Sequence, residues 1–527
     1  MIQLRTQTEA YWGPEFALTD GDIEHISTYF LEKERPQTAE QLTRALMAHR
    51  VAAERSDAER LLTGRTVYQP HKSYQIGEEV IFPALEFVHS TVDQVRDGQN
   101  PQLGQFKVIQ VKINGRNREF ATALKTEHAL NVPDDTDVFA DLINTDLDGL
   151  YTMYGAPVRS KLIVALSKNQ EFIRLSGKWF MKALLAEINV GHLHLAEAIL
   201  EMSEGGPASA EAILPHLDLD SSIHPEAQQF SLNYQLWQDG RFDEVAPVGK
   251  VEWFLKRMEP DEVKELPKRL AYNPISYDRA LLSPQLMLLE RELDDEWSNL
   301  EPSQIKQPVM FTLTYAHRLV GTIPFSTRIR PLFPESNSPR QRVVLLDEQT
   351  NEEIVTWVVR EHRYIYGLKK WYNDQSMPIG GFIHLKPGPE SGVLLIDYDR
   401  RRPQREWVRL ATVVDNRLHF ELNRRSISCG YDDLLIVGTD VITAVDALWK
   451  RAETNQRSIA SLLAEIFPQL AELTPQKTVH AKTLYSAINM LRRVPPGPLF
   501  AELVRHPAFQ SVGDHYWRFE SDKWRST

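Results

Sequence analysis

The chain is poor in cysteine and has no long apolar run. Its 527 residues include one cysteine, Cys429, which excludes an intrachain disulfide and a multi-cysteine zinc site. No apolar run approaches the ~20 residues that a membrane-spanning helix needs. The first residues, MIQLRTQTEAYWGPEF, lack a basic segment followed by an apolar core, so we expect no signal peptide. These absences predict a soluble protein with no membrane partner, and the cytoplasm as its simplest location.

Motifs that would identify a catalytic reaction are also missing. There is no Gly-x-x-x-x-Gly-Lys-Ser/Thr loop and no Gly-x-Ser-x-Gly elbow. The pairs His480/Lys482 and His384/Lys386 have the His-x-Lys spacing of a phospholipase D-type nuclease, but neither has the aspartate that should follow. We therefore predict a non-enzymatic protein without a catalytic, cofactor or metal site, and a nuclease is the weakest of the alternatives.

Charge is unevenly distributed along the chain. The formal net charge is -12 at pH 7, which argues against non-specific coating of nucleic acid. Between residues 316 and 410, however, fifteen Lys or Arg residues stand against eleven Asp or Glu. This local excess predicts a basic surface on an otherwise acidic protein.

The first 130 residues combine helices with short strands. Residues 20–50 predict two helices separated by Pro36, which are either the front of a helix-turn-helix or a plain helical hairpin. From Val67 to Leu124 the apolar period changes to two, with turn residues between the alternating stretches. This second pattern predicts a small antiparallel barrel of SH3-like size.

Two helix-rich stretches share one ending. Residues 170–260 predict helices, beginning with KWFMKALLAEIN, and close with Phe242 and Trp253 on either side of a glycine turn. The last 80 residues predict helices and close in the same way, with Phe509 and Trp517. The shared ending resembles the wing of winged-helix domains. The middle copy has no Lys or Arg from 224 to 240 and is assigned to protein contacts, while the basic C-terminal copy leaves nucleic-acid contact open.

Seven short stretches between residues 309 and 422 predict β-strands, and the first of them alternates apolar and polar residues. They are VMFTLTY, RVVLL, IVTWVV, GFIHLK, GVLLI, WVRLAT and RLHFEL. So many strands in so short a segment predict a closed or nearly closed barrel, because closure removes sheet edges.

The motifs between these strands resemble those of the B3-type DNA-binding pseudobarrel of plant transcription factors and of effector domains in some bacterial restriction enzymes. The matching residues are Gly321, Ile323, Pro324, Phe333, Pro334, Asp347, Gly367, Leu368 and Gly380. The chain departs from the pattern at Gly381, where the family usually has an acidic residue. The resemblance implies two arms that grip the major groove of duplex DNA.

The resemblance assigns DNA contacts residue by residue, and a basic turn is added from the sequence alone. The predicted DNA-binding residues are Ser326, Thr327, Arg328 and Arg330 in the first arm, Lys369, Lys370, Trp371, Tyr372 and Asn373 in the second, and Arg400, Arg401 and Arg402 in the turn. Arginine suits this role because its rigid fork can hold a guanine edge or a phosphate by two bonds. The alternative is that these cations are solvated or pair with nearby carboxylates.

The expected fold class is α+β and multidomain, with winged-helix-like α domains alternating with SH3-like and B3-like β-barrels. The predicted domains are a helix-turn-helix-like domain (1–64), an SH3-like barrel (65–130), a helical winged-helix-like domain (131–258), linker helices (259–305), a B3-like pseudobarrel (306–430) and a C-terminal winged-helix-like domain (431–527). The expected function is non-enzymatic binding of double-stranded DNA, in transcription regulation or in targeting of a defence or restriction system, with protein partners at the winged-helix modules. The alternative is a protein-interaction scaffold, such as an accessory of the transcription machinery.

Overall fold

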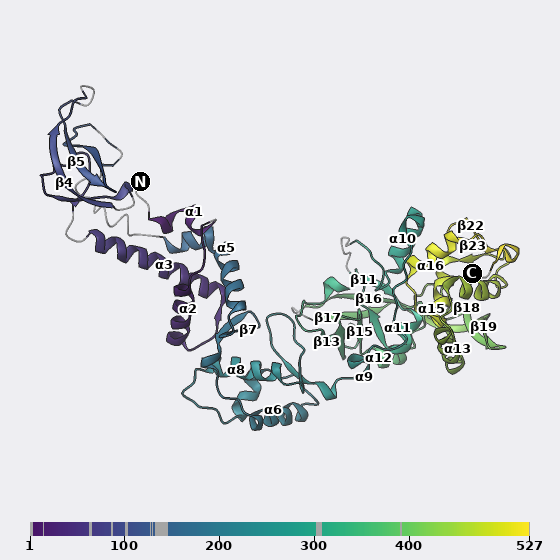
Figure 1. Cartoon of the computed structure of the whole chain (residues 1–527). Helices are drawn as coiled ribbons and strands as arrows, with labels where there is room; N and C mark the ends of the chain where they lie inside the picture. The colour runs from purple at the N-terminus through teal and green to yellow at the C-terminus, as the bar shows by residue number, and fades with distance from the viewer. Residues whose placement is uncertain are drawn as a thin grey trace. The chain divides into compact units, whose positions relative to one another are not determined.

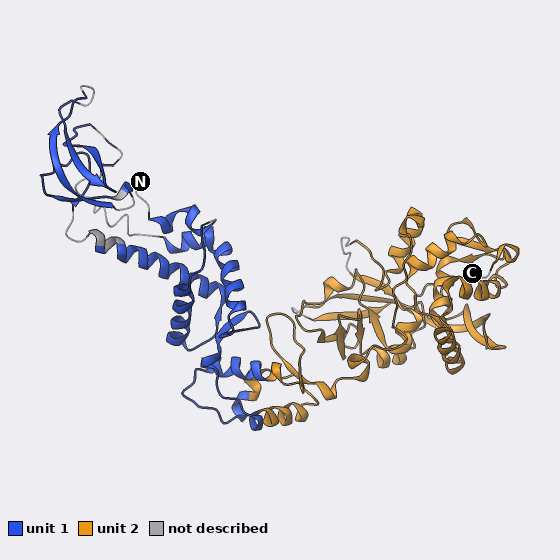
Figure 2. Cartoon of the chain, in the orientation of Figure 1, with its two compact units in different colours: residues 1–192, 214–235 blue, residues 193–213, 236–527 orange. Residues whose placement is uncertain are grey.

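The protein forms two compact units. The computed structural model describes residues 4–13, 15–62, 66–85, 88–100, 104–126, 128, 130–131, 146–301, 308–389 and 393–525. Unit 1 comprises residues 1–192 and 214–235, and unit 2 comprises residues 193–213 and 236–527 (Figure 2). Within these units the six predicted domains remain a prediction.

Unit 1 contains a helical core and a separate sheet. Its helices are α1 (Glu9–Trp12), α2 (Asp20–Lys33), α3 (Ala39–Leu62), α5 (Leu147–Lys168) and most of α8 (Pro225–Gln238). Thr19 caps α2 through a reciprocal pair of hydrogen bonds with Asp22, which satisfies backbone groups that the first turn leaves open. Trp12, Ile26, Phe30 and Leu162 are among the buried residues of the helical core.

The sheet of unit 1 has the strand order β2-β3-β4-β5-β6. Its strands are β2 (Thr66–Val67), β3 (Glu79–Phe82), β4 (Val88–Asp97), β5 (Lys107–Ile113) and β6 (Arg116–Thr122). Pairs β3-β4, β4-β5 and β5-β6 are antiparallel. The antiparallel strands that the period of two predicted between residues 67 and 124 are therefore confirmed.

One predicted helix of unit 1 is a strand. KWFM, the start of the stretch expected to be helical, forms β8 (Lys178–Met181), which pairs with β7 (Phe172–Leu175) and with β1 (Gln37–Thr38). Ser176 and Gly177 both have positive φ, as a tight hairpin turn requires. Trp179 and Phe180 are both buried. The prediction was wrong because a short apolar run occurs both in buried strands and in helices, so its sequence does not distinguish the two.

The two predicted aromatic hairpins are present. β9 (Phe242–Glu244) pairs antiparallel with β10 (Trp253–Leu255), and β22 (Phe509–Gly513) pairs with β23 (Tyr516–Phe519). The first follows α6 (Val190–Met202) and α7 (Ala210–Ile213) in the chain, and β10 leads to the short α9 (Asp261–Lys264).

The centre of unit 2 is a seven-stranded sheet that curls into a half-barrel (Figure 1). Its order is β11-β16-β17-β13-β14-β15-β12, and β13 and β17 run parallel. The strands are β11 (Val309–Thr312), β12 (Thr322–Pro324), β13 (Arg340–Asp347), β14 (Glu353–Val359), β15 (Tyr364–Tyr366), β16 (Phe382–Pro387) and β17 (Leu394–Tyr398). The helices α11 (Tyr315–Val320) and α12 (Lys369–Asp374) interrupt the strands.

The last two predicted barrel strands belong to another sheet. β18 (Arg400–Val414) and β19 (Arg417–Cys429) form a long antiparallel hairpin, and β20 (Gly438–Thr439) joins β18 in parallel. Asp415 and Asn416 both have positive φ, which suits a two-residue turn between twisted strands.

The C-terminal part of unit 2 is a helical bundle. Its helices are α13 (Ile442–Thr454), α14 (Ile459–Ala471), α15 (Ala481–Leu491) and α16 (Pro496–Arg505), and β21 (Val479–His480) pairs with β23. Every residue of α15 is buried. Helix α10 (Pro284–Leu293) contributes Leu286 and Leu289 to the same core. None of the helices in the described ranges is long and apolar enough to cross a lipid bilayer.

Candidate nucleic-acid interface

The first predicted arm lies against the C-terminal end of α10. Ser326 is fully buried and donates its hydroxyl hydrogen to Asp294. Arg328 is half-buried, pairs with Asp294 at 3.0 Å and donates to the carbonyl of Glu292 at 2.8 Å. Burial raises the pKa of the Asp294 carboxyl, and the nearby Arg328 guanidinium opposes that rise. Of the four predicted residues in this arm, only Arg330 is exposed, and Thr327 is half-buried.

Two residues of the second predicted arm belong to the core of the half-barrel. Trp371 is buried and donates its indole N–H to Asp347 Oδ2 at 2.7 Å. Burial opposes ionisation of Asp347, but hydrogen bonds from this indole and from the backbone of Thr350 lower the pKa of its carboxyl. Tyr372 is fully buried and donates to the carbonyl of Thr322 at 3.0 Å. These two aromatic side chains therefore position α12 in the fold.

The remaining residues of the second arm are exposed. Lys370 pairs with Glu352 at 3.3 Å and with Asp374 at 3.4 Å. Lys369 and Asn373 line a cavity of about 450 Å³ together with Arg318. The structure thus brings together two predicted DNA-binding residues with an arginine from α11.

The predicted basic turn is the start of strand β18. Arg400 packs over the Tyr398 ring at 4.2 Å and pairs with Asp397 at 3.4 Å. Arg401 and Arg402 are exposed, and neither pairs with a carboxylate in the described part of the chain. Of the three predicted residues, the latter two are therefore available to an external anion.

One face of the β18–β19 hairpin carries an exposed tryptophan between arginines. Trp407 lies opposite Arg424 in the strand register, Arg405 lies opposite Ser426, and alternation places all four side chains on the same face. Trp407 is 64% exposed, and the Arg424 guanidinium lies 5.7 Å from the centre of its ring. Arg401 and Arg402 precede this face on β18, beyond the irregular register between Arg400 and Gln404. We call Arg405, Trp407 and Arg424, together with Arg401 and Arg402, the hairpin patch.

The hairpin patch has free positive charge. Among the described residues, none of its four arginines forms an ion pair with a carboxylate, in contrast to Arg328 and Lys370. Trp407 and Arg424 were not predicted as site residues. The available signal was the alternation of residues 404–410, but this pattern does not show which face a neighbouring domain covers.

Two basic residues of the C-terminal copy are internal. Lys482 is buried and pairs with Asp432 at 2.7 Å. Arg493 is buried and pairs with Asp295 and Glu296. These two cations are therefore not available for the nucleic-acid contact that the sequence left open in this copy.

Comparison of the chain with protein-family models, curated proteins and solved structures finds no significant match. The described ranges also contain no group of three or more His, Cys, Asp or Glu side chains placed to hold a metal ion.

Proposed function

We propose that the protein binds duplex DNA, with the hairpin patch as the principal contact surface. The single observation that carries the proposal is the exposed face on which Trp407 lies beside arginines that have no carboxylate partner in the described chain. Guanidinium groups hold phosphate oxygens by charge-assisted hydrogen bonds, and a two-stranded ribbon fits the major groove of B-DNA.

The exposed part of the second arm supports the same proposal. Lys369 and Asn373 are exposed and line the cavity that Arg318 also lines. Within the proposal, the half-barrel is B3-like, the five-stranded sheet is SH3-like and the helical bundles are winged-helix-like. The proposed role is non-enzymatic, in transcription regulation or in targeting of a defence or restriction system.

Trp407 favours a second candidate, single-stranded nucleic acid. An exposed aromatic ring flanked by cations is a stacking platform for an unpaired base, worth about 1–3 kcal/mol per base. Trp407→Ala then weakens binding of a single strand more than binding of the duplex of the same sequence. The opposite order favours the duplex.

The test is an anisotropy titration of a labelled duplex of mixed sequence with the full chain. We expect Arg405→Ala/Arg424→Ala to weaken binding without lowering the melting temperature, because both residues are exposed. A matched control is Arg116→Ala/Arg118→Ala, which removes two exposed arginines from strand β6. Equal losses in the two double variants would show that only overall charge matters, and would refute the hairpin patch as the site.

A further inference from the structure

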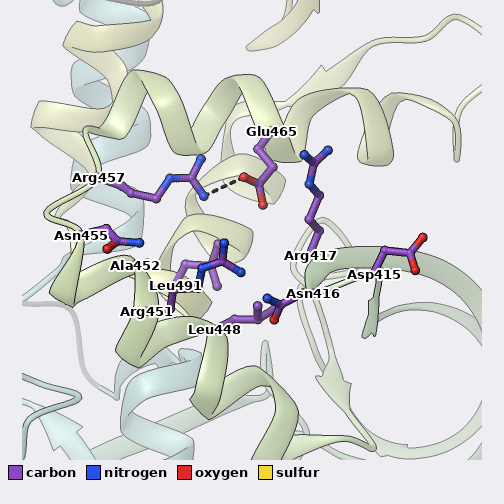
Figure 3. A pocket seen from close by; sticks show the side chains of 10 residues that line it. All are labelled: Asp415, Asn416, Arg417, Leu448, Arg451, Ala452, Asn455, Arg457, Glu465 and Leu491. Carbon is purple, nitrogen blue, oxygen red and sulfur yellow. Dashed lines mark ion pairs between the residues drawn. The ribbon is translucent and has the colours of Figure 1, made fainter.

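A polar cavity of about 430 Å³ lies where the β18–β19 turn meets the C-terminal helices. Three arginines line it. Arg417 is the first residue of β19, Arg451 lies in the last turn of α13, and Arg457 precedes the N-cap residue of α14. Figure 3 shows the three side chains extending toward one space. The cavity is separate from the hairpin patch and has residues of its own.

The charges in this cavity are not balanced. Arg457 pairs with Glu465 at 2.6 Å and donates to the Ser461 hydroxyl at 3.1 Å. Arg417 and Arg451 have no carboxylate partner in the described residues. Asp415 also lines the cavity, but its carboxylate points away from the guanidinium groups in Figure 3.

We propose that this cavity binds a small phosphomonoester through Arg417 and Arg451. The pair Arg457–Glu465 is internally neutral, so the two unpaired guanidinium groups supply two positive charges. A phosphomonoester carries about −1.5 to −2 at pH 7, which matches them better than the single charge of a carboxylate. Arginine forks also match the oxygen geometry of phosphate.

The rest of the lining accommodates the organic part of such a ligand. Leu448, Ala452 and Leu491 supply apolar surface, and Asn416 and Asn455 supply amides that can both donate and accept hydrogen bonds. The volume lies within the range of about 300–1,000 Å³ that is common for small-molecule sites. The ligand class is therefore a phosphate ester of the size of a nucleoside monophosphate or a sugar phosphate.

Isothermal titration of the full chain with AMP, ribose 5-phosphate and adenosine tests the proposal. Binding of AMP with no binding of ribose 5-phosphate assigns the nucleotide, and binding of both assigns the phosphate group as the common determinant. We expect no binding of adenosine. Arg451→Ala and Arg417→Ala should each weaken binding by about tenfold to a hundredfold, because each removes hydrogen bonds from a charged donor.

Arg451→Lys is the conservative control, since it keeps the charge and loses the fork, and it should weaken binding less than Arg451→Ala. Removal of these exposed, unpaired side chains should leave the melting temperature of the free protein unchanged. It should also abolish the rise in melting temperature that AMP produces. Unchanged affinity in Arg417→Ala/Arg451→Ala, or no binding of either phosphate ester at millimolar concentration, would overturn the proposal. Because Arg405 and Arg424 are untouched, the result is independent of DNA binding.

Discussion

Arg493 Nη2 lies 2.6 Å from Asp295 Oδ2, although 198 residues separate the two in the sequence. The arginine side chain is 4% exposed and the aspartate side chain 1%. Tyr485 donates to the same carboxylate at 2.6 Å, and Arg493 also pairs with Glu296 at 2.7 Å. This buried network joins the end of α15 to the segment that follows α10.

Arg493→Ala should therefore destabilise unit 2 severely. Removing one partner of a buried ion pair leaves an uncompensated charge in the interior, at a cost of about 3–5 kcal/mol. Urea unfolding followed by circular dichroism measures the loss. Arg505→Ala is the matched control, because Arg505 is 69% exposed in its pair with Glu502 and should cost less than about 1 kcal/mol. Similar losses in the two variants would show that the network is not stabilising.

Stability should fall in mild acid because of His480. This buried residue caps α15 by accepting a hydrogen bond from the Lys482 backbone N–H at 3.1 Å, and burial, with His515 and Lys482 nearby, lowers its pKa to about 4. The folded state thus favours neutral imidazole. The contribution of the neutral His480 to the free energy of unfolding is complete above the unfolded-state pKa of about 6.5. It decreases as pH falls from there and is fully lost below the folded-state pKa of about 4, a loss of up to about 3 kcal/mol.

His480→Asn separates this effect from the titration of carboxylates. Asparagine is a good N-cap and does not titrate, so the variant should lose stability less steeply between pH 6.5 and pH 4. Denaturant midpoints across this range provide the measurement. Parallel pH profiles for the variant and the parent would mean that protonation of His480 is not the cause.

Trp371→Phe tests whether this residue of the second arm is structural. The substitution removes the indole donor to Asp347 and leaves a buried carboxylate short of one hydrogen bond, which should cost about 1–3 kcal/mol. We expect the melting temperature to fall and the DNA affinity of the folded protein to stay the same. Lost affinity at an unchanged melting temperature would instead make Trp371 a DNA contact.

Gly321→Ala should disturb the junction between α11 and α12. Gly321 has φ of +85°, and a Cβ there would lie 2.6 Å from the backbone nitrogen of Lys369. Gly249→Ala is the control, because Gly249 has φ of +97° with no atom within 4 Å of the added Cβ. Gly249→Ala should lower the free energy of unfolding by about 1–2 kcal/mol, because alanine disfavours the left-handed backbone. Gly321→Ala should lower it by about 1–3 kcal/mol more, because its Cβ also overpacks against Lys369. Equal costs would contradict the close approach at Lys369.

The sequence predicted those elements whose pattern is local. The short stretch RVVLL at residues 342–346 predicted a strand, and the structure has β13 at Arg340–Asp347. The three-residue strands β12 and β15 were missed, because so few residues cannot establish a period. β18 and β19 were predicted as strands, but alternation within each strand does not determine which sheet it joins.

The candidate site was harder to predict than the fold. The predicted arms include Ser326, Trp371 and Tyr372, which are buried, because short motif positions do not reveal which side chains face the core. Burial and ion pairing of Lys482 and Arg493 involve residues at least 50 positions away. Contacts of this kind depend on tertiary structure and leave no periodic signal in the sequence.

The salt dependence of duplex binding tests the central claim most directly. Each phosphate contact contributes about −0.9 to the slope of log K against log salt, so the four arginines of the hairpin patch predict a slope near −3.6 for the parent. Arg405→Ala/Arg424→Ala should reduce its magnitude by about 1.8, while Arg116→Ala/Arg118→Ala leaves it unchanged. A parent that shows no salt-dependent binding, or identical slopes in the two double variants, would contradict DNA binding by the hairpin patch.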